Sequence, residues 1–246
     1  MQQYLIDDEI QANTPPAALT QVAPGWHALF VIAAIAALAV RGMLRTSQMP
    51  AGLGQDRIAL YGRTILCEWL LLALVLFGVW LNGSSFYDVL GQRWRSGKIV
   101  VRDAGIAAAF LIVSILITSI IGGHGAAANR SIQFLLPRSG AESALWLVLS
   151  MTAGICEEFL YRGWLLTLIG HYFSSMWVGL IVSSICFGFA HAYQGRAGIL
   201  STGILGIVFG LVFIASGSLL PGQILHTIID LNNGLSMGRL ASRSTG

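Results

Sequence analysis

Long apolar stretches are the feature of this sequence that most restricts its fold. A helix needs about 20 apolar residues to cross roughly 30 Å of hydrocarbon, and lipid provides no partner for the polar groups of an open backbone. The apolar stretches are 26–40, 62–81, 104–122, 142–169, 175–192, 197–216 and 219–238. The sequence therefore predicts an all-α fold, a polytopic transmembrane bundle of about seven spans, with roughly six to eight as the range that the length allows.

The composition fits a membrane protein better than a soluble one. Apolar residues make up 55% of the chain and charged residues 10%, whereas about a quarter of the residues of a soluble domain are charged. The mean hydropathy is +0.73. The net charge of +3 comes from scattered arginines, and no basic run alternates with aromatic residues as in a nucleic-acid groove. We therefore expect membrane lipids, and no nucleic acid, as partners.

We expect two parts in the chain, a polar amino-terminal segment at 1–25 and a single membrane domain at 26–246. The polar segment contains Asp7, Asp8 and Glu9. The first apolar stretch therefore lacks the basic region that precedes the core of a cleavable signal peptide. We expect this stretch to stay in the mature protein.

Glycines mark one face of the sixth apolar stretch. Gly206 and Gly210 form a GxxxG pattern, with Gly203 nearby. In a membrane, small residues at this spacing let the backbone of another helix approach closely. We expect a neighbouring helix to pack tightly here.

Three ionisable side chains interrupt the fourth apolar stretch near its middle, namely Glu157, Glu158 and Arg162. Each charge at the centre of a span costs about 2.5–3.5 kcal/mol, so the three would cost up to roughly 10 kcal/mol if unpaired. On a helix, Glu158 and Arg162 face each other at i,i+4, whereas Glu157 points about 100° away. We expect Glu158 to pair with Arg162 and Glu157 to act as a base. The alternative is a single structural salt-bridge cluster.

Two more apolar stretches carry polar side chains. The fifth ends in a segment from Phe187 to His191, and the seventh contains His226 and Asp230, which lie at i,i+4 on one helical face. A lone histidine in an apolar helix is more often a packing residue. Polar residues within spans, however, normally face the interior of the bundle. We therefore predict one shared cavity lined by Glu157, Glu158, Arg162, His191, His226 and Asp230.

The polar motifs follow one another in a specific order along 140–238, the expected catalytic core. They are Glu157-Glu158-x-x-x-Arg162, Phe187-x-x-x-His191 and His226-x-x-x-Asp230. This ordered set resembles the CPBP (CaaX protease and bacteriocin-processing, or Abi) family, which includes the type II CaaX prenyl endopeptidases. The resemblance implies an intramembrane glutamate endopeptidase that needs no metal or other cofactor. It also implies a hydrophobic or lipidated peptide substrate and, for the chain itself, the cell membrane of a prokaryote.

The resemblance also implies a role for each motif. Glu157 would take a proton from water that His191 helps to bind. His226 and the residue four positions later would stabilise the oxyanion that forms when water attacks the peptide carbonyl. Glu158 and Arg162, together with Phe187, would support the site.

Asp230 departs from the pattern, because the prenyl endopeptidases carry an asparagine at that position, although the wider family tolerates aspartate. An asparagine amide can donate a hydrogen bond to an oxyanion, whereas an ionised carboxylate cannot. Asp230 must then either be protonated or orient and charge His226, which would be the donor. Asn233, at i+7 from His226, lies on the same face and could supply the missing donor.

Two other functions remain open from the residues alone. The same Glu, His and Asp side chains could bind a catalytic zinc ion, although the chain has no HExxH motif. A non-enzymatic transporter or immunity protein could use buried carboxylates and histidines as a proton relay. Against a transporter, the two halves show no matching pair of Gly/Pro-broken spans.

Overall fold

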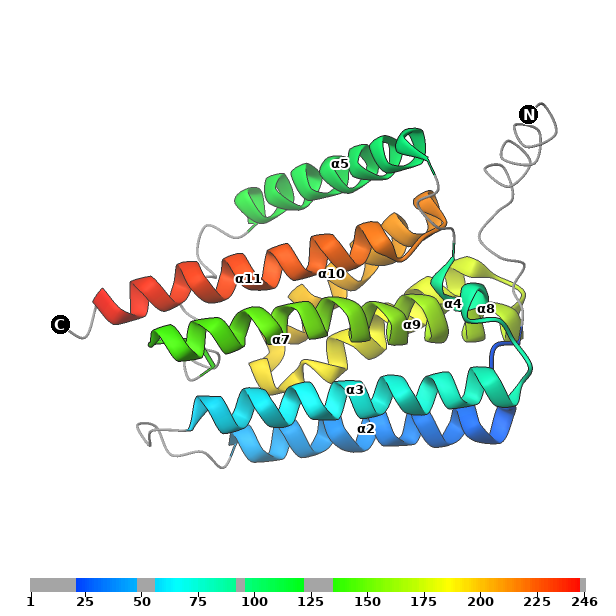
Figure 1. Cartoon of the computed structure of the whole chain (residues 1–246), viewed down its shortest axis with the longest axis horizontal. Coiled ribbons are helices and arrows are strands. Elements are labelled where there is room, and N and C mark those ends of the chain that lie inside the picture. The colour runs from blue at the N-terminus through cyan, green and yellow to red at the C-terminus, as the bar shows by residue number, and fades with distance from the viewer. Residues whose placement is uncertain (1–20, 48–55, 92–95, 122–134, 244–246) are drawn as a thin grey trace.

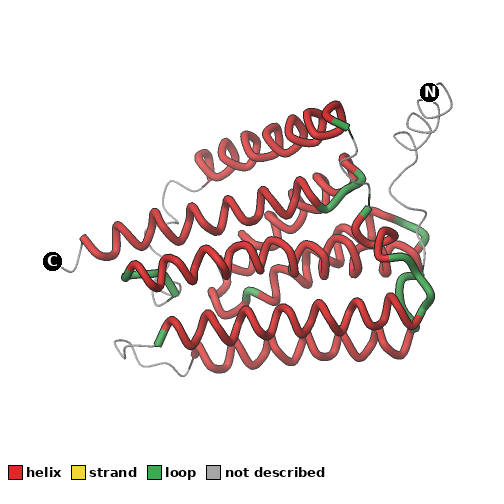
Figure 2. Tube along the Cα trace, viewed as in Figure 1, coloured by secondary structure: helices red, strands yellow, loops and turns green. Residues whose placement is uncertain are grey.

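A computed structural model describes residues 21–47, 56–91, 96–121 and 135–243. These residues form helices joined by short loops and no strand, as Figure 2 shows. Most of the predicted polar segment at 1–25 lies outside the described residues.

The predicted apolar stretches all coincide with helices in the described part of the chain. The long helices are α2 (Gly25–Ser47), α3 (Arg57–Leu81), α5 (Gly97–Ile121), α7 (Gly140–Glu158), α9 (Met176–Ala190), α10 (Gly195–Ser216) and α11 (Leu220–Arg243). The short elements are α4 (Phe86–Leu90), the π-helix η1 (Phe159–Leu166), α8 (Thr167–Phe173) and the 3₁₀ turn η2 (Ala192–Gln194). The prediction of an all-α helical bundle is therefore confirmed.

Several of these helices can cross a bilayer. Among the described residues, four segments are long and apolar enough, and α9 is a shorter apolar helix. The four are Gly25–Leu44, Arg57–Leu81, Gly140–Phe173 and Ala192–Ser216. Large apolar side chains on the outside of the bundle, such as Trp69, Leu70 and Ile185, are exposed in the isolated chain. Such a surface suits contact with lipid rather than water.

Helix α7 occupies the middle of the bundle, between α11 on one side and α3 on the other (Figure 1). Gly154 is one reason why α11 lies so close to α7. A Cβ atom at Gly154 would collide with the side chain of Thr227 and lie 2.7 Å from the carbonyl oxygen of Gln223. This close approach brings the polar face of α11 next to the polar end of α7.

The glycine face of α10 packs tightly against α9, as predicted. A Cβ atom at Gly206 would lie 3.0 Å from the Cα of Ser184, and one at Gly210 would collide with the side chain of Leu180. The residue before Gly210, Phe209, is buried and lies against α11 through its contact with His226. Helix α10 therefore joins α9 and α11, the two helices that carry the histidines.

The helix with the Glu-Glu motif does not continue as a regular α-helix. α7 ends at Glu158, and the π-helix η1 begins at Phe159. Every residue of η1 is buried. The sequence of this segment therefore has no alternation of apolar and polar faces from which the wider turn of a π-helix could be predicted. Our expectation of a regular α-helix through this segment was therefore wrong in this detail. Single π-turns occur frequently at functional sites.

Candidate active site

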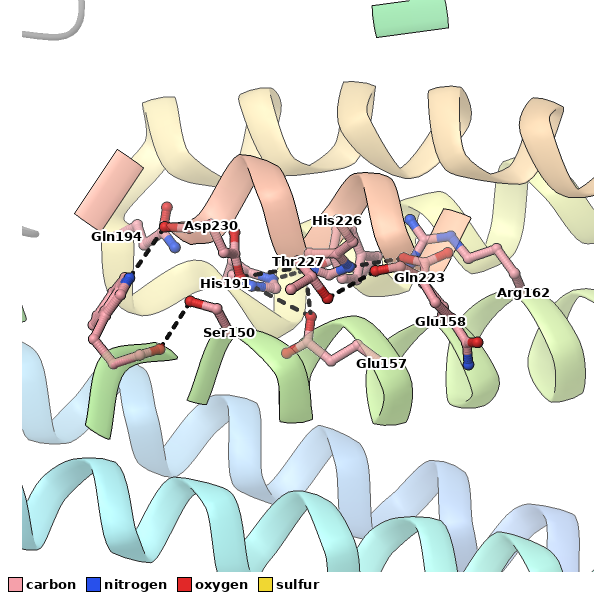
Figure 3. Close-up of polar contacts among 12 residues, drawn as sticks. Ser150, Glu157, Glu158, Arg162, His191, Gln194, Gln223, His226, Thr227 and Asp230 are labelled. Carbon is pink, nitrogen blue, oxygen red and sulfur yellow. Dashed lines mark hydrogen bonds and ion pairs between the residues drawn. The ribbon is translucent and has the colours of Figure 1, made fainter. Parts of the chain in front are cut away.

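The structure brings the predicted polar residues together from three helical segments, as Figure 3 shows. Glu157 and Glu158 end α7, and Arg162 lies in η1. His191 follows the last residue of α9. His226 and Asp230 lie one turn apart on α11.

Glu158 links two of these partners at the buried end of the site. Its Oε1 atom lies 3.1 Å from Nη1 of Arg162, and both side chains are 1% exposed. The predicted i,i+4 pair is therefore present. The same Oε1 atom accepts a hydrogen bond of 2.9 Å from Nδ1 of His226. Because the carboxylate can only accept, this contact places a proton on Nδ1 and fixes the orientation of the imidazole ring.

Aromatic rings surround the guanidinium group of Arg162. Its central carbon lies 4.2 Å from the ring centroid of Phe187 and 5.2 Å from that of Phe209. Phe209 also stacks on the His226 ring at 4.9 Å with an interplanar angle of 13°. The guanidinium group thus makes cation–π contacts with these rings in addition to its ion pair with Glu158. These contacts reduce the free-energy cost of burying the ion pair. Phe209 could not be selected from the sequence, because it is an apolar residue in an apolar stretch.

Glu157 faces both imidazole rings. Its Oε2 atom lies 4.0 Å from Nε2 of His191 and 3.8 Å from Nε2 of His226, and its side chain is 19% exposed. In His191, Nδ1 lies 2.9 Å from the carbonyl oxygen of Phe187. That carbonyl can only accept, so Nδ1 carries the proton and, in the neutral ring, Nε2 presents a lone pair toward Glu157. The two distances exceed a direct hydrogen bond and suit a bridging water.

Asp230 contacts the same nitrogen of His226 that faces Glu157. Its Oδ2 atom lies 3.4 Å from Nε2 of His226, and its side chain is 36% exposed. The backbone carbonyl of Asp230 accepts a hydrogen bond of 3.1 Å from Nε1 of Trp146 on α7. Asn233 lies almost one turn further along α11 with an exposed side chain. Both nitrogens of His226 therefore face carboxylates.

The segment that carries this geometry matches a known family. Residues 139–232 match the family model described as type II CAAX prenyl endopeptidase Rce1-like. This segment is an Rce1-like domain. The predicted CPBP resemblance is thereby confirmed over this segment, and the long apolar helices indicate an integral membrane protein. Neither the curated proteins nor the solved structures give a match.

The Rce1-like domain contains all the motif residues from Glu157 to Asp230, whereas Asn233 falls just beyond it. A further ionisable residue, Glu68, lies outside the domain on α3. Its carboxyl group interacts electrostatically with Glu157, His226 and Asp230. Its Oε2 atom is buried and makes no hydrogen bond within the described part of the chain. Glu68 was not among the predicted site residues, although it is a carboxylate inside the second apolar stretch, and a carboxylate inside an apolar span indicates a functional site there as much as it does for Glu157.

The side-chain positions also bear on a metal site. Within the described ranges, no group of three or more His, Cys, Asp or Glu side chains is arranged to hold a metal ion. Oε2 of Glu157 lies 4.0 Å from Nε2 of His191 and 3.8 Å from Nε2 of His226, and these three side chains are the ones that a zinc ion would share in the alternative mechanism.

Proposed function

We propose that the chain is an intramembrane endopeptidase in which Glu157 activates water to hydrolyse a peptide bond. One observation carries this proposal: two adjacent glutamates lie in opposite surroundings. Glu158 is buried and paired with Arg162, whereas Glu157 is partly exposed and faces two imidazole nitrogens. A partly exposed carboxylate that faces imidazoles and has no arginine or lysine paired with it in the described ranges is suited to accept a proton, while a buried, paired carboxylate is suited to hold its neighbours in place.

In the first step, a water molecule lies between Glu157 and His191. It donates one hydrogen bond to Oε2 of Glu157 and the other to the lone pair on Nε2 of His191. Glu157 takes the first proton as the water oxygen bonds to the carbonyl carbon of the substrate. The carbonyl oxygen then becomes an oxyanion.

His226 stabilises this oxyanion. Glu158 accepts a hydrogen bond from Nδ1 of the ring, and Asp230 lies 3.4 Å from Nε2. Of the two roles considered for Asp230, these contacts favour the one in which it orients and charges the histidine. Nε2 of His226 then donates to the oxyanion, and one such donor contributes about 10²–10³ in rate. Asn233 remains a candidate for an additional donor.

In the last step, the tetrahedral intermediate collapses. The carbon–nitrogen bond breaks as the nitrogen receives a proton, so that the products are a carboxylic acid and an amine. Glu157 gains one proton from water, and the nitrogen receives one proton. Once Glu157 has released its proton, the chain is back in its starting protonation state. No metal ion takes part in this proposal, and zinc chemistry with the same residues is the alternative.

We propose a hydrophobic or lipidated peptide as substrate. The outer surface of the bundle is apolar, and the matching family model is described as a prenyl endopeptidase. A substrate of this kind partitions into the bilayer, since each buried CH₂ of a lipid chain contributes about 0.8 kcal/mol. The cell membrane of a prokaryote is the proposed location.

The test compares Glu157→Gln with Glu142→Gln, both on α7. The probe is a farnesylated Cys-aliphatic-aliphatic-X peptide carrying a fluorophore and a quencher, added to purified protein in vesicles. Glu157→Gln keeps the shape of the side chain but removes the base, so kcat should fall by about 10²–10⁴. Glu142→Gln, at the far end of α7, should retain normal turnover.

A second arm tests the proposal without a chosen substrate. Peptides released from cells that express the wild-type chain are compared by mass spectrometry with those from cells that express Glu157→Ala. Peptides that disappear in the variant identify natural substrates. Equal peptide release and equal probe turnover in wild type and variant would refute the proposed role of Glu157.

A further inference from the structure

We propose that Glu68 is a further catalytic residue, the acid that delivers a proton to the amine that leaves when the peptide bond breaks. This inference rests on the proposed function and adds a residue from outside the Rce1-like domain.

Glu68 occupies the inward face of α3. The buried residues of this helix include Tyr61, Leu72, Val75 and Val79, which follow one another at the spacing of one helical face. Glu68 belongs to the same row, seven residues after Tyr61 and four before Leu72. An apolar side chain at this position would be more stable, because an ionisable group inside a span costs several kcal/mol unless it is paired. The presence of a carboxyl group here therefore indicates a function.

The carboxyl group of Glu68 interacts with residues of the candidate active site. Glu68 interacts electrostatically with Glu157, His226 and Asp230, and also with Cys156, the residue before Glu157. Helix α3, which carries Glu68, packs directly against α7, on the side of α7 opposite to α11 (Figure 1).

The surroundings of Glu68 suit a carboxylic acid that carries its proton. Its Oε2 atom is buried and makes no hydrogen bond in the described ranges. Three charged groups interact with it: Glu157 and Asp230 are carboxylates, and only His226 can be a cation. A second negative charge in this place would be repelled and unsolvated, whereas a neutral acid avoids both costs and provides an O–H donor.

The two carboxyl groups then have complementary tasks. Glu157 takes a proton from water as the new carbon–oxygen bond forms. The neutral Glu68 gives its proton to the substrate nitrogen as the carbon–nitrogen bond breaks. After the products leave, the proton on Glu157 passes to Glu68, which restores both groups, so that water is the only reactant consumed besides the peptide.

The two sides of α7 match the two sides of a peptide bond. In a trans peptide the carbonyl oxygen and the N–H point in opposite directions. A carbonyl directed at His226 on α11 turns the N–H side of the bond away from α11, and Glu68 lies on a different helix, α3. In this proposal the acid on α3 protonates the nitrogen while His226 on α11 contacts the oxyanion.

The decisive variant is Glu68→Gln, compared with Asp56→Asn. Both variants replace a carboxylate by an amide, the first within α3 and the second at its N-cap. Asp56 is the residue that caps the start of that helix, where asparagine caps as well as aspartate. Turnover is measured on the farnesylated probe peptide and on a matched ester in which an oxygen replaces the scissile N–H, because an ester needs much less help from an acid when its leaving group departs.

Glu68→Gln should lower kcat for the peptide by about 10²–10⁴ and leave the ester rate within about tenfold of wild type. Asp56→Asn should leave both rates unchanged. A purely structural role of Glu68 would reduce the two rates equally, and an equal loss, or no loss, would overturn the inference. Glu157→Gln serves as the reference that slows both substrates.

An infrared measurement separates this inference from the proposed function. The difference spectrum of wild type minus Glu68→Gln, taken without substrate, should contain the carbonyl stretch of a protonated carboxyl group. A carboxylate band in its place would refute the role of Glu68 as an acid even if the enzyme is active. If the wild-type chain cleaves neither the probe nor cellular peptides, the proposed function fails, and the infrared band still decides the state of Glu68.

Discussion

The two ends of the polar cluster differ in burial and in the way their charges are matched. At the closed end, Glu158 and Arg162 are each 1% exposed and lie 3.1 Å apart. At the open end, Glu157 and Asp230 are 19% and 36% exposed, and both face the same nitrogen of His226. One imidazole joins the two ends, because its Nδ1 bonds to Glu158. The closed end therefore holds the ring in place, while the open end leaves Glu157 and Asp230 partly exposed, as the proposed proton transfer requires.

The largest expected effect comes from breaking the closed end with Arg162→Leu. This variant leaves Glu158 buried without its cation, and loss of one partner of a buried ion pair costs about 3–5 kcal/mol. The free energy of unfolding, measured by denaturant titration in detergent micelles, should fall by that amount. Glu157→Gln at the open end should change it by less than about 1 kcal/mol.

A double variant provides the control for this prediction. Glu158→Gln combined with Arg162→Leu removes both charges and keeps an oxygen that can accept from His226. Its stability should lie above that of Arg162→Leu alone, because no uncompensated charge remains. If Glu157→Gln destabilised the protein as much as Arg162→Leu, the two ends would not differ in the way described.

The next effect comes from separating the helices that carry the two ends. Gly154→Val places a side chain where a Cβ atom would collide with Thr227 and lie 2.7 Å from the carbonyl oxygen of Gln223. Overpacking of this kind costs about 1–3 kcal/mol. It should also move His226 away from Glu157 and lower kcat on the probe peptide. Gly140→Ala at the start of α7, where a Cβ atom would meet no other atom within 4 Å, should leave stability and kcat unchanged.

Much of this arrangement could be predicted from the sequence, for a physical reason. In lipid, apolar length fixes where helices lie and charge fixes which face turns inward, so the helices and the pairing of Glu158 with Arg162 were both predictable. The first and last residues of the helices were less predictable. α5 begins at Gly97 rather than at 104, because Asp103 is fully buried and Arg102 donates to the carbonyl oxygen of Ser216. Polar residues can extend a helix when protein surrounds them.

The details that the sequence left open depend on packing between distant segments. Phe209 contacts His226 only because α10 lies against α11. The π-helix η1 is buried on every side, which removes the periodic pattern that distinguishes helix types. Glu68 is different, because its presence inside an apolar stretch was visible. It lacked only a motif to connect it with the other polar residues, and the contact of α3 with α7 provides that connection.

A smaller effect is expected from Asp230→Asn, which sharpens the comparison at the open end. If Asp230 orients and charges His226, an uncharged amide weakens that contact by about 1 kcal/mol, the difference between a charged and a neutral hydrogen bond. kcat should fall about fivefold, with stability unchanged. A higher kcat would show instead that an amide donor at this position assists the oxyanion. Asn233→Ala tests the other candidate donor, and unaltered turnover would remove Asn233 from the mechanism.

The smallest expected effect is that of a chelator, which distinguishes acid–base chemistry from zinc chemistry at the open end. A zinc ion bound by Glu157, His191 and His226 would need Nε2 of His226 as a ligand, and that atom lies 3.4 Å from Oδ2 of Asp230. The metal would have to displace this contact. We therefore expect phenanthroline to leave kcat on the probe peptide unchanged and metal analysis of the purified protein to find far less zinc than the one ion per chain that a catalytic zinc site would hold. Loss of activity that added zinc restores would reassign Glu157 and the two histidines as metal ligands, and the open end would then be a metal site.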